Sequence, residues 1–141
     1  MKISKTFYWE MGHRLLFHTG KCINVHGHSY RAEIIFEGEA DSNGILIDFY
    51  DIKKMISPFI DKLDHSCMVY KGDVKLINAL NKLNSKLFIT ENHPTAENIA
   101  DLFLEHLKTK KIPKNITSAG VKIYETSDSF AEAYSEIRHK K

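Results

Sequence analysis

The chain has 141 residues, enough for one domain with a substantial core, and its 43% hydrophobic and 27% charged residues are ordinary for a globular protein. The formal net charge is only +2 and no long run of lysine or arginine appears, which argues against a nucleic-acid-binding protein. No apolar stretch is long enough to span a membrane, and the first residues lack the apolar segment of a signal peptide. Two cysteines, Cys22 and Cys67, are too few for a disulfide framework. We therefore expect a single domain over residues 1–141, located in a reducing cytoplasm.

The N-terminal third of the chain predicts strands. Residues 2–12 alternate loosely between apolar and polar side chains, and residues 16–25 indicate a loop. Residues 28–37 alternate cleanly, which is typical of a strand with one buried face. A turn is expected at 41–44, and residues 45–49 then suggest the returning strand of a hairpin.

Helical spacing appears further along. Apolar residues between Phe49 and Leu63 recur at helical intervals, with Pro58 inside the pattern as an expected kink. A weaker helix covers about 73–83, and Pro94 with Thr95 begins a third. A late strand and a last strand over 130–136 follow. This order predicts an α+β fold with a mainly antiparallel sheet rather than βαβ repeats.

His26 and His28 flank Gly27 where a loop enters a strand. Residues two apart in a strand point to the same face, so both imidazoles can reach one ion, and His13 from a neighbouring strand would complete a three-histidine site. Three neutral imidazoles with an open fourth position are typical of catalytic zinc. Spacing leaves two alternatives open: hydrogen-bonded histidines with no metal, and a structural zinc with Cys22 as its fourth ligand.

Other chemically active groups lie elsewhere in the chain. Cys22 is four residues before His26, and a thiol near a cation tends toward thiolate, although a lone cysteine is usually inert; Cys67 is interpreted as inert. Asp64 and His65 follow the long helix and suit a general acid/base pair or, alternatively, a solvated helix end.

Carboxylates and a hydroxyl complete the candidate set. Glu125 shares the face of Val121 and Ile123 on the late strand, where it either lies at the edge of the sheet or binds N–H groups of a ligand. Thr95 and Glu97, at a helix start, suit a cap and an acid favoured by the helix dipole. Together with the histidines, the thiol and the Asp-His pair, these residues are more typical of an enzyme site than of a binding module.

The chain resembles the 6-pyruvoyltetrahydropterin synthase family and, within it, the bacterial 6-carboxytetrahydropterin synthases of queuosine biosynthesis. The matching segments occur in the family's order along nearly the whole chain, and they are residues 9–15, 22–30, 44–49, 63–65, 94–100 and 121–126. The Cys-x₃-His-Gly-His block is the most specific of them, and its short gap is similar to that of the bacterial enzymes.

The resemblance implies roles for the matching residues. His13, His26 and His28 would bind zinc, and Cys22, Asp64 and His65 would form a catalytic triad. Glu125 would bind the pterin ring, with Thr95 and Glu97 lining the same pocket. The implied substrate is 7,8-dihydroneopterin triphosphate, and the implied products are 6-carboxytetrahydropterin, acetaldehyde and triphosphate.

The resemblance also implies a tunnelling fold, a four-stranded antiparallel sheet with two main helices on one face. Trimers of this fold close into a barrel and pair into a homohexamer with active sites between subunits. Some residues depart from the family pattern: Met11 and Gly12 precede the first ligand where small residues such as alanine are usual, Trp9 replaces a common phenylalanine, and His93 is an insertion before Pro94. None of these removes a proposed ligand or triad residue, but they change the shape of the pocket and so leave the product open. A pyruvoyl synthase and a non-catalytic metal- or pterin-binding protein are the alternatives.

Overall fold

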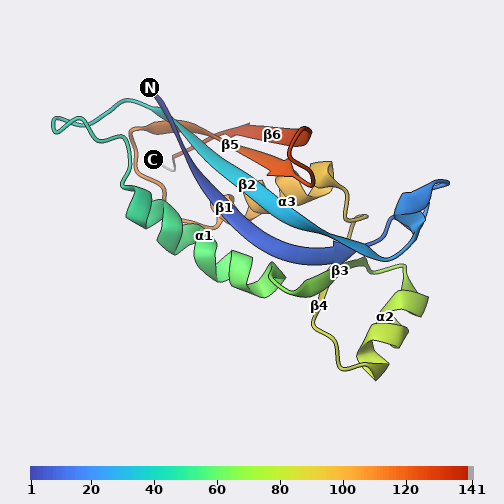
Figure 1. Ribbon diagram of the computed structural model, residues 1–141. Coiled ribbons are helices and arrows are strands. Elements are labelled where there is room, and N and C mark those ends of the chain that lie inside the picture. Colours follow the sequence, from blue (N-terminus) through green and yellow to red (C-terminus); the bar gives the residue numbers. More distant parts are fainter. Residues whose placement is uncertain (140–141) are drawn as a thin grey trace.

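The computed structural model describes residues 1–139, which form a mixed β-sheet with two long helices packed on one face and a shorter helix against the other face (Figure 1). The elements, in chain order, are β1 (Lys2–His13), the 3-10 turn η1 (Lys21–Ile23), β2 (His26–Gly38), α1 (Phe49–Leu63), β3 (Ser66–Tyr70), α2 (Val74–Lys82), β4 (Leu87–Thr90), α3 (Ala96–Lys108), β5 (Ile116–Tyr124) and β6 (Phe130–Glu136). The sheet order is β4-β3-β1-β2-β5-β6. The α+β class is confirmed, and none of the helices within residues 1–139 is long and apolar enough to cross a membrane.

The expected four-stranded antiparallel sheet is wrong in strand number, because the described chain has six strands and two of them are parallel additions. β1, β2, β5 and β6 pair antiparallel, whereas β3 runs parallel to β1 and β4 runs parallel to β3. The first four residues of β3 are all buried, because Met68 packs into the main core while Cys67 and Val69 pack against Leu76 of α2. A strand buried on both faces shows no alternation, so its sequence pattern resembles any short apolar run.

The hairpin strand expected over residues 45–49 is also wrong. The turn before it is present, since the Asp41 carboxylate accepts hydrogen bonds from the backbone N–H groups of Asn43 and Ile45, both at 2.9 Å. Both edges of β2 are already paired, with β1 and with β5, so the returning segment has no strand to join. It instead buries Leu46 and Ile47 in the core and leads into α1.

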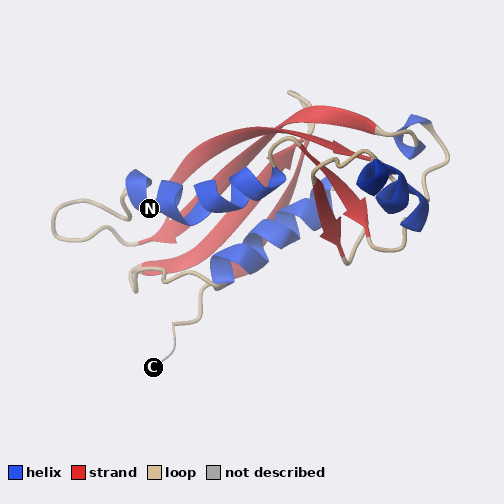
Figure 2. Ribbon diagram, turned by 90° about the horizontal axis from the view of Figure 1, so that it is seen from below, coloured by secondary structure: helices blue, strands red, loops and turns tan. Residues whose placement is uncertain are grey.

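The helices agree more closely with the sequence pattern. α1 spans the expected residues and continues through Pro58, with Asp48 capping its first turn by accepting a hydrogen bond from Tyr50 N. α2 and α3 lie where the second and third helices were expected. α1 and α3 lie side by side across one face of the sheet, and we call this the inner face (Figure 2).

The register of β1 with β2 places the histidines on the inner face, next to the core. Trp9 lies opposite Tyr30 and stacks on it, with ring centroids 5.2 Å apart. Two residues further along β1, Met11 lies opposite His28, and two residues beyond that His13 lies opposite His26. Residues that face each other across an antiparallel pair share a face, so the histidines continue the inner face at the end of the sheet.

Candidate metal centre

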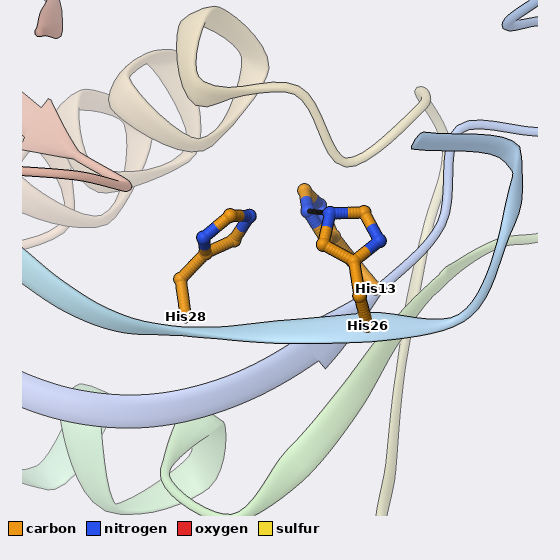
Figure 3. A group of neighbouring side chains, drawn as sticks. All are labelled: His13, His26 and His28. Carbon is orange, nitrogen blue, oxygen red and sulfur yellow. Dashed lines mark hydrogen bonds between the residues drawn. The ribbon is translucent and has the colours of Figure 1, made fainter. Parts of the chain in front are cut away.

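Three imidazoles converge where β1 ends and β2 begins (Figure 3). His13 is the last residue of β1, His26 is the first residue of β2, and His28 follows on the same face. One ring nitrogen from each histidine lies within 4.8 Å of the others, and the two Nε2 atoms of His13 and His26 are 3.2 Å apart. The structure therefore brings together the three residues that the sequence pattern proposed as ligands.

Backbone carbonyls orient two of these rings. His13 Nδ1 lies 2.7 Å from the Pro94 carbonyl oxygen, and His26 Nδ1 lies 2.7 Å from that of Asn24. A carbonyl can only accept, so each Nδ1 carries the hydrogen and each Nε2 presents a lone pair. Two lone pairs facing each other repel unless a cation lies between them. Zinc–nitrogen bonds of about 2.0–2.1 Å in tetrahedral geometry separate the nitrogens by about 3.3 Å, which fits the observed pair.

Burial makes two of the three rings, those of His13 and His28, suitable for a metal. His13 is 1% exposed, and burial lowers the pKa of both His13 and His28, so the rings stay neutral. His28 Nε2 is buried and has no hydrogen-bond partner among the described residues. A buried His28 nitrogen without a hydrogen-bond partner, close to ring nitrogens of His13 and His26, is more typical of a divalent-metal site than of a cluster of hydrogen-bonded histidines. Among residues 1–139 the group contains the three histidines without Cys22, which removes support for a fourth cysteine ligand within one chain.

Glu125 lies beside the histidines, one residue past the end of β5. Its Oε1 is 3.8 Å from His13 Nε2, and its Oε2 is 4.0 Å from His28 Nε2. Tyr30, which is fully buried, donates its hydroxyl to Glu125 Oε1 at 3.4 Å, and burial raises the pKa of this phenol so that it remains a donor. Glu125 is half-buried, with 31% of its side chain exposed. It can therefore accept hydrogen bonds from a ligand next to the metal cluster.

Thr95 and Glu97 begin α3 close to this cluster. Thr95 Oγ1 accepts a hydrogen bond from Asn98 N at 3.2 Å, so the cap expected from the sequence is present. Thr95 also follows Pro94, whose carbonyl orients His13. Glu97 is exposed in the first turn and makes no hydrogen bond or ion pair with the cluster among the described residues.

The side chains of Asp64 and His65 are in contact at ion-pair distance, an outcome that their sequence positions left open. Asp64 Oδ1 is 3.0 Å from His65 Nδ1 and accepts a hydrogen bond from Glu10 N at 2.9 Å. That backbone hydrogen bond is the main cause of the lowered pKa of Asp64, which keeps the carboxylate ionised. His65 has a left-handed backbone, with φ of 57°, and its N–H donates to Glu10 O at 2.7 Å. The pair is thus held firmly against β1.

This pair lies on the opposite side of β1 from the metal cluster. Glu10 belongs to the outer face, where Ser29 Oγ donates to its carboxylate at 2.8 Å. His65 lines a shallow hollow of about 380 Å³ together with Glu10 and Ser29, and the lining also includes His28. His13, three residues along β1 from Glu10, faces inward. One chain therefore brings Glu125 and Thr95 to the histidines but leaves Asp64 and His65 on the other face.

Cys22 lies in the loop between β1 and β2, within η1. Its thiol is free and half-buried, and its carbonyl accepts a hydrogen bond from Leu15 N at 2.8 Å. This loop is the connection from His13 to His26, so Cys22 stays near the metal end of the sheet. The structure thus gives Cys22 and the Asp64–His65 pair separate locations within the chain.

Sequence reasoning missed three groups at this site. Tyr30 received no role in the site from the sequence, although its position two residues after His28 on the same face could have indicated a contact. The carbonyls of Asn24 and Pro94 carry no sequence signal, because any residue has a carbonyl and only the fold directs it. These three groups orient His13, His26 and Glu125.

Known proteins are similar in sequence to nearly the whole of this chain. The family model of 6-pyruvoyl tetrahydropterin synthase matches residues 2–136. A 6-carboxy-5,6,7,8-tetrahydropterin synthase of Rickettsia felis is 35% identical over 140 residues, covering 94% of this chain and 99% of that protein. The protein of that name from Haemophilus influenzae is 34% identical, covering 93% and 96%.

Solved structures show the same fold at lower sequence identity. The 6-pyruvoyl tetrahydropterin synthase of Plasmodium falciparum superposes with a TM-score of 0.75 at 19% identity, covering 97% of this chain and 98% of that chain. The Caenorhabditis elegans enzyme of this name gives a TM-score of 0.70 at 23% identity, covering 96% and 95%. The chain belongs to the 6-pyruvoyl tetrahydropterin synthase family. It is accordingly an enzyme, a pterin lyase.

Proposed function

We propose that this chain is a zinc-dependent 6-carboxytetrahydropterin synthase of queuosine biosynthesis. It would convert 7,8-dihydroneopterin triphosphate and water to 6-carboxy-5,6,7,8-tetrahydropterin, acetaldehyde and triphosphate. The observation that carries the proposal is the donor set in which His13 and His26 give Nδ1–H to carbonyls and turn Nε2 toward each other, beside Glu125. The names of the bacterial relatives support the carboxy product.

His13, His26 and His28 would hold the zinc through their Nε2 atoms. The two carbonyl hydrogen bonds lock the tautomers that this binding requires, and burial lowers the pKa of His13, which disfavours protonation of that ring. When bound, zinc supplies Lewis acidity that lowers the pKa of a substrate hydroxyl. Three protein ligands leave coordination open to the substrate, as in other catalytic sites.

Glu125 would bind the pterin ring by accepting hydrogen bonds from its amino and ring N–H groups. The hydroxyl of Tyr30 fixes one carboxylate oxygen, so the other keeps a constant direction. Thr95 and Glu97, at the start of α3, would line the same pocket. A ring held at one end presents its side chain to the metal cluster in a constant orientation, and such alignment is a large part of catalysis.

Cys22 as thiolate would remove a proton from the substrate side chain, and Asp64 with His65 would shuttle protons on the other side. The contact of the Asp64 carboxylate with His65 Nδ1 at 3.0 Å would orient the imidazole for that work. Because this pair and the metal cluster lie on opposite faces of one sheet, we infer that a neighbouring subunit supplies it. A homohexamer built from two trimers is the proposed assembly.

The product decides between this proposal and its closest alternative. Purified zinc-loaded protein is incubated with 7,8-dihydroneopterin triphosphate, and acetaldehyde is measured with an alcohol dehydrogenase assay beside chromatographic analysis of the pterin. We expect acetaldehyde and 6-carboxytetrahydropterin in equal amounts. Pyruvoyltetrahydropterin without acetaldehyde would make the chain a 6-pyruvoyl tetrahydropterin synthase, an activity that the names of the solved neighbours favour.

A Cys22→Ala variant tests the non-catalytic alternative. An enzyme should lose turnover by about 10²-fold or more yet keep its zinc, because the thiol would act on the proton and not on the metal. A protein that merely binds a metal or a pterin should bind both as before and show no turnover in either form.

A further inference from the structure

The loop of residues 14–25 connects the two metal-binding strands and carries two groups of the site. Cys22 lies in its second half, and the carbonyl of Asn24 orients His26. We call this segment the Cys22 loop. The position of the Cys22 loop relative to the sheet determines the distance from the Cys22 thiol to the metal cluster.

An aromatic contact holds the tip of the Cys22 loop. The ring of Phe17 meets the ring of His93 edge-on, with centroids 4.7 Å apart and planes at 70°. His93 in turn contacts Tyr70 at the end of β3, with centroids 4.2 Å apart. Phe17 is 58% exposed, so this contact is its main attachment and not part of a continuous core. Edge-to-face pairs of this kind are favourable beyond their buried area.

Hydrogen bonds transmit the position of Phe17 to Cys22. Leu15 N donates to Cys22 O at 2.8 Å and so joins the two arms of the loop. His18 N donates to Leu15 O at 3.0 Å, which closes the turn that contains Phe17. At the base of the loop, the Arg14 guanidinium makes two hydrogen bonds to Asp73, at 2.5 and 2.6 Å. The loop is therefore anchored both at its base and at its tip.

His93 also adjoins the other half of the site. It directly precedes Pro94, whose carbonyl orients His13, and its own carbonyl accepts hydrogen bonds from Thr95 N and Asn98 Nδ2. The Phe17–His93 contact thus joins the segment that orients His26 to the segment that orients His13. His93 Nδ1 is buried with no hydrogen-bond partner within residues 1–139, which indicates that the ring acts here by packing.

We propose that Phe17 and His93 are positioning residues that hold the Cys22 loop against the metal end of the sheet and so set the place of the Cys22 thiol. The catalytic consequence rests on the proposed function, whereas the contact between Phe17 and His93, which we call the clamp, is a property of the fold. Because packing is the proposed role of His93, a phenylalanine at this position should preserve the contact with Phe17, whereas an alanine should remove it.

The test compares Phe17→Ala, His93→Ala and His93→Phe with the wild type. Phe49→Ala is the matched control, since Phe49 is 51% exposed and lies at the start of α1, outside the loop. The first measurement is the rate at which iodoacetamide alkylates Cys22, followed by peptide mass spectrometry with buried Cys67 as the internal reference. Loss of one aromatic contact should raise this rate about 3- to 10-fold in the two alanine variants, and leave it within about twofold in His93→Phe and Phe49→Ala.

The second measurement is steady-state turnover of 7,8-dihydroneopterin triphosphate together with zinc content. We expect kcat to fall about tenfold in Phe17→Ala with KM and zinc content nearly unchanged, because a small displacement of a reacting group lowers the rate steeply. A merely structural role would change the unfolding midpoint and KM together instead. Equal alkylation rates in wild type and Phe17→Ala would overturn the clamp. An absence of turnover in the wild type would defeat the proposed function, and the alkylation rates would still decide the clamp.

Discussion

Replacing His28 with alanine tests the metal centre, because it separates the effect of this side chain on the stability of the metal-free fold from its effect on stabilisation by zinc. Without metal, His28 Nε2 is buried and has no hydrogen-bond partner among residues 1–139, and such an atom lowers the stability of the fold by about 1–3 kcal/mol. The lost packing of an imidazole whose side chain is 20% exposed costs about 1–2 kcal/mol. The two terms offset each other, so we expect the metal-free variant to have a free energy of unfolding within about 1 kcal/mol of the wild type.

With zinc the wild type and the variant should diverge. Zinc at about 100 times its Kd stabilises the folded wild type by about 2.7 kcal/mol, which raises the Tm of a chain of this size by about 8 °C. His28→Ala retains two of the three imidazoles, and its zinc-dependent shift should fall below about 2 °C.

Differential scanning calorimetry with EDTA and with zinc measures both quantities. His139→Ala serves as the control, since the hydrogen bond of His139 to Ile116 O lies apart from the cluster and its loss should leave the zinc shift intact. An equal zinc-dependent shift in wild type and His28→Ala would refute the metal assignment. A metal-free variant several kcal/mol less stable than the wild type would refute the view that His28 is an unsatisfied ligand.

Three further predictions concern the substrate, the assembly and the pH dependence of stability. Glu125→Gln should lower kcat/KM by about 10²-fold with zinc content unchanged, because an amide presents one acceptor where the carboxylate presents two, and pterin kinetics with metal analysis will measure this. Mixing the inactive Cys22→Ala and His65→Ala proteins through mild dissociation should restore about a quarter of wild-type turnover if sites form between subunits, whereas sites within one chain would stay inactive. Hydrogen bonds from the Arg14 guanidinium lower the pKa of Asp73, so this pair stabilises the fold above the unfolded-state pKa of about 3.9 and the stabilisation is lost as pH falls through the lower folded-state value. Asp73→Asn should therefore lower the free energy of unfolding by about 2–3 kcal/mol at pH 6 and by much less at pH 2.5; urea titrations that give equal losses would contradict this.

Local patterns predicted most of the elements in this chain. The alternation over β2 and the helical spacing over α1 arise from one buried face, which leaves a periodic trace in the sequence. β3 left no such trace because it is buried on both faces, and its parallel pairing joins segments whose contact no local pattern encodes. Leu46 and Ile47 were misassigned for a related reason, since burial alone does not distinguish a strand from a packed loop.

In the candidate site, too, the sequence predicted some groups and only the structure revealed the others. The sequence identified the side chains of the three histidines and Glu125, and it left the Asp64–His65 contact open. It could not indicate the carbonyls of Pro94 and Asn24, which fix the histidine tautomers, because a backbone group carries no residue identity. The roles of Cys22, Thr95 and Glu97 remain predictions that the experiments above address.

By itself, the sequence determined which chemistry is available: imidazoles two residues apart on one strand, a thiol in the loop before them, and a carboxylate on an apolar face. Those are properties of spacing, and spacing is local. Only the tertiary structure decided that His13 meets His26 with Nε2 facing Nε2, and that Asp64 and His65 lie on the other face of the same sheet. Such relations depend on strand register and on which face each strand turns toward the helices, and the packing of the whole chain sets both.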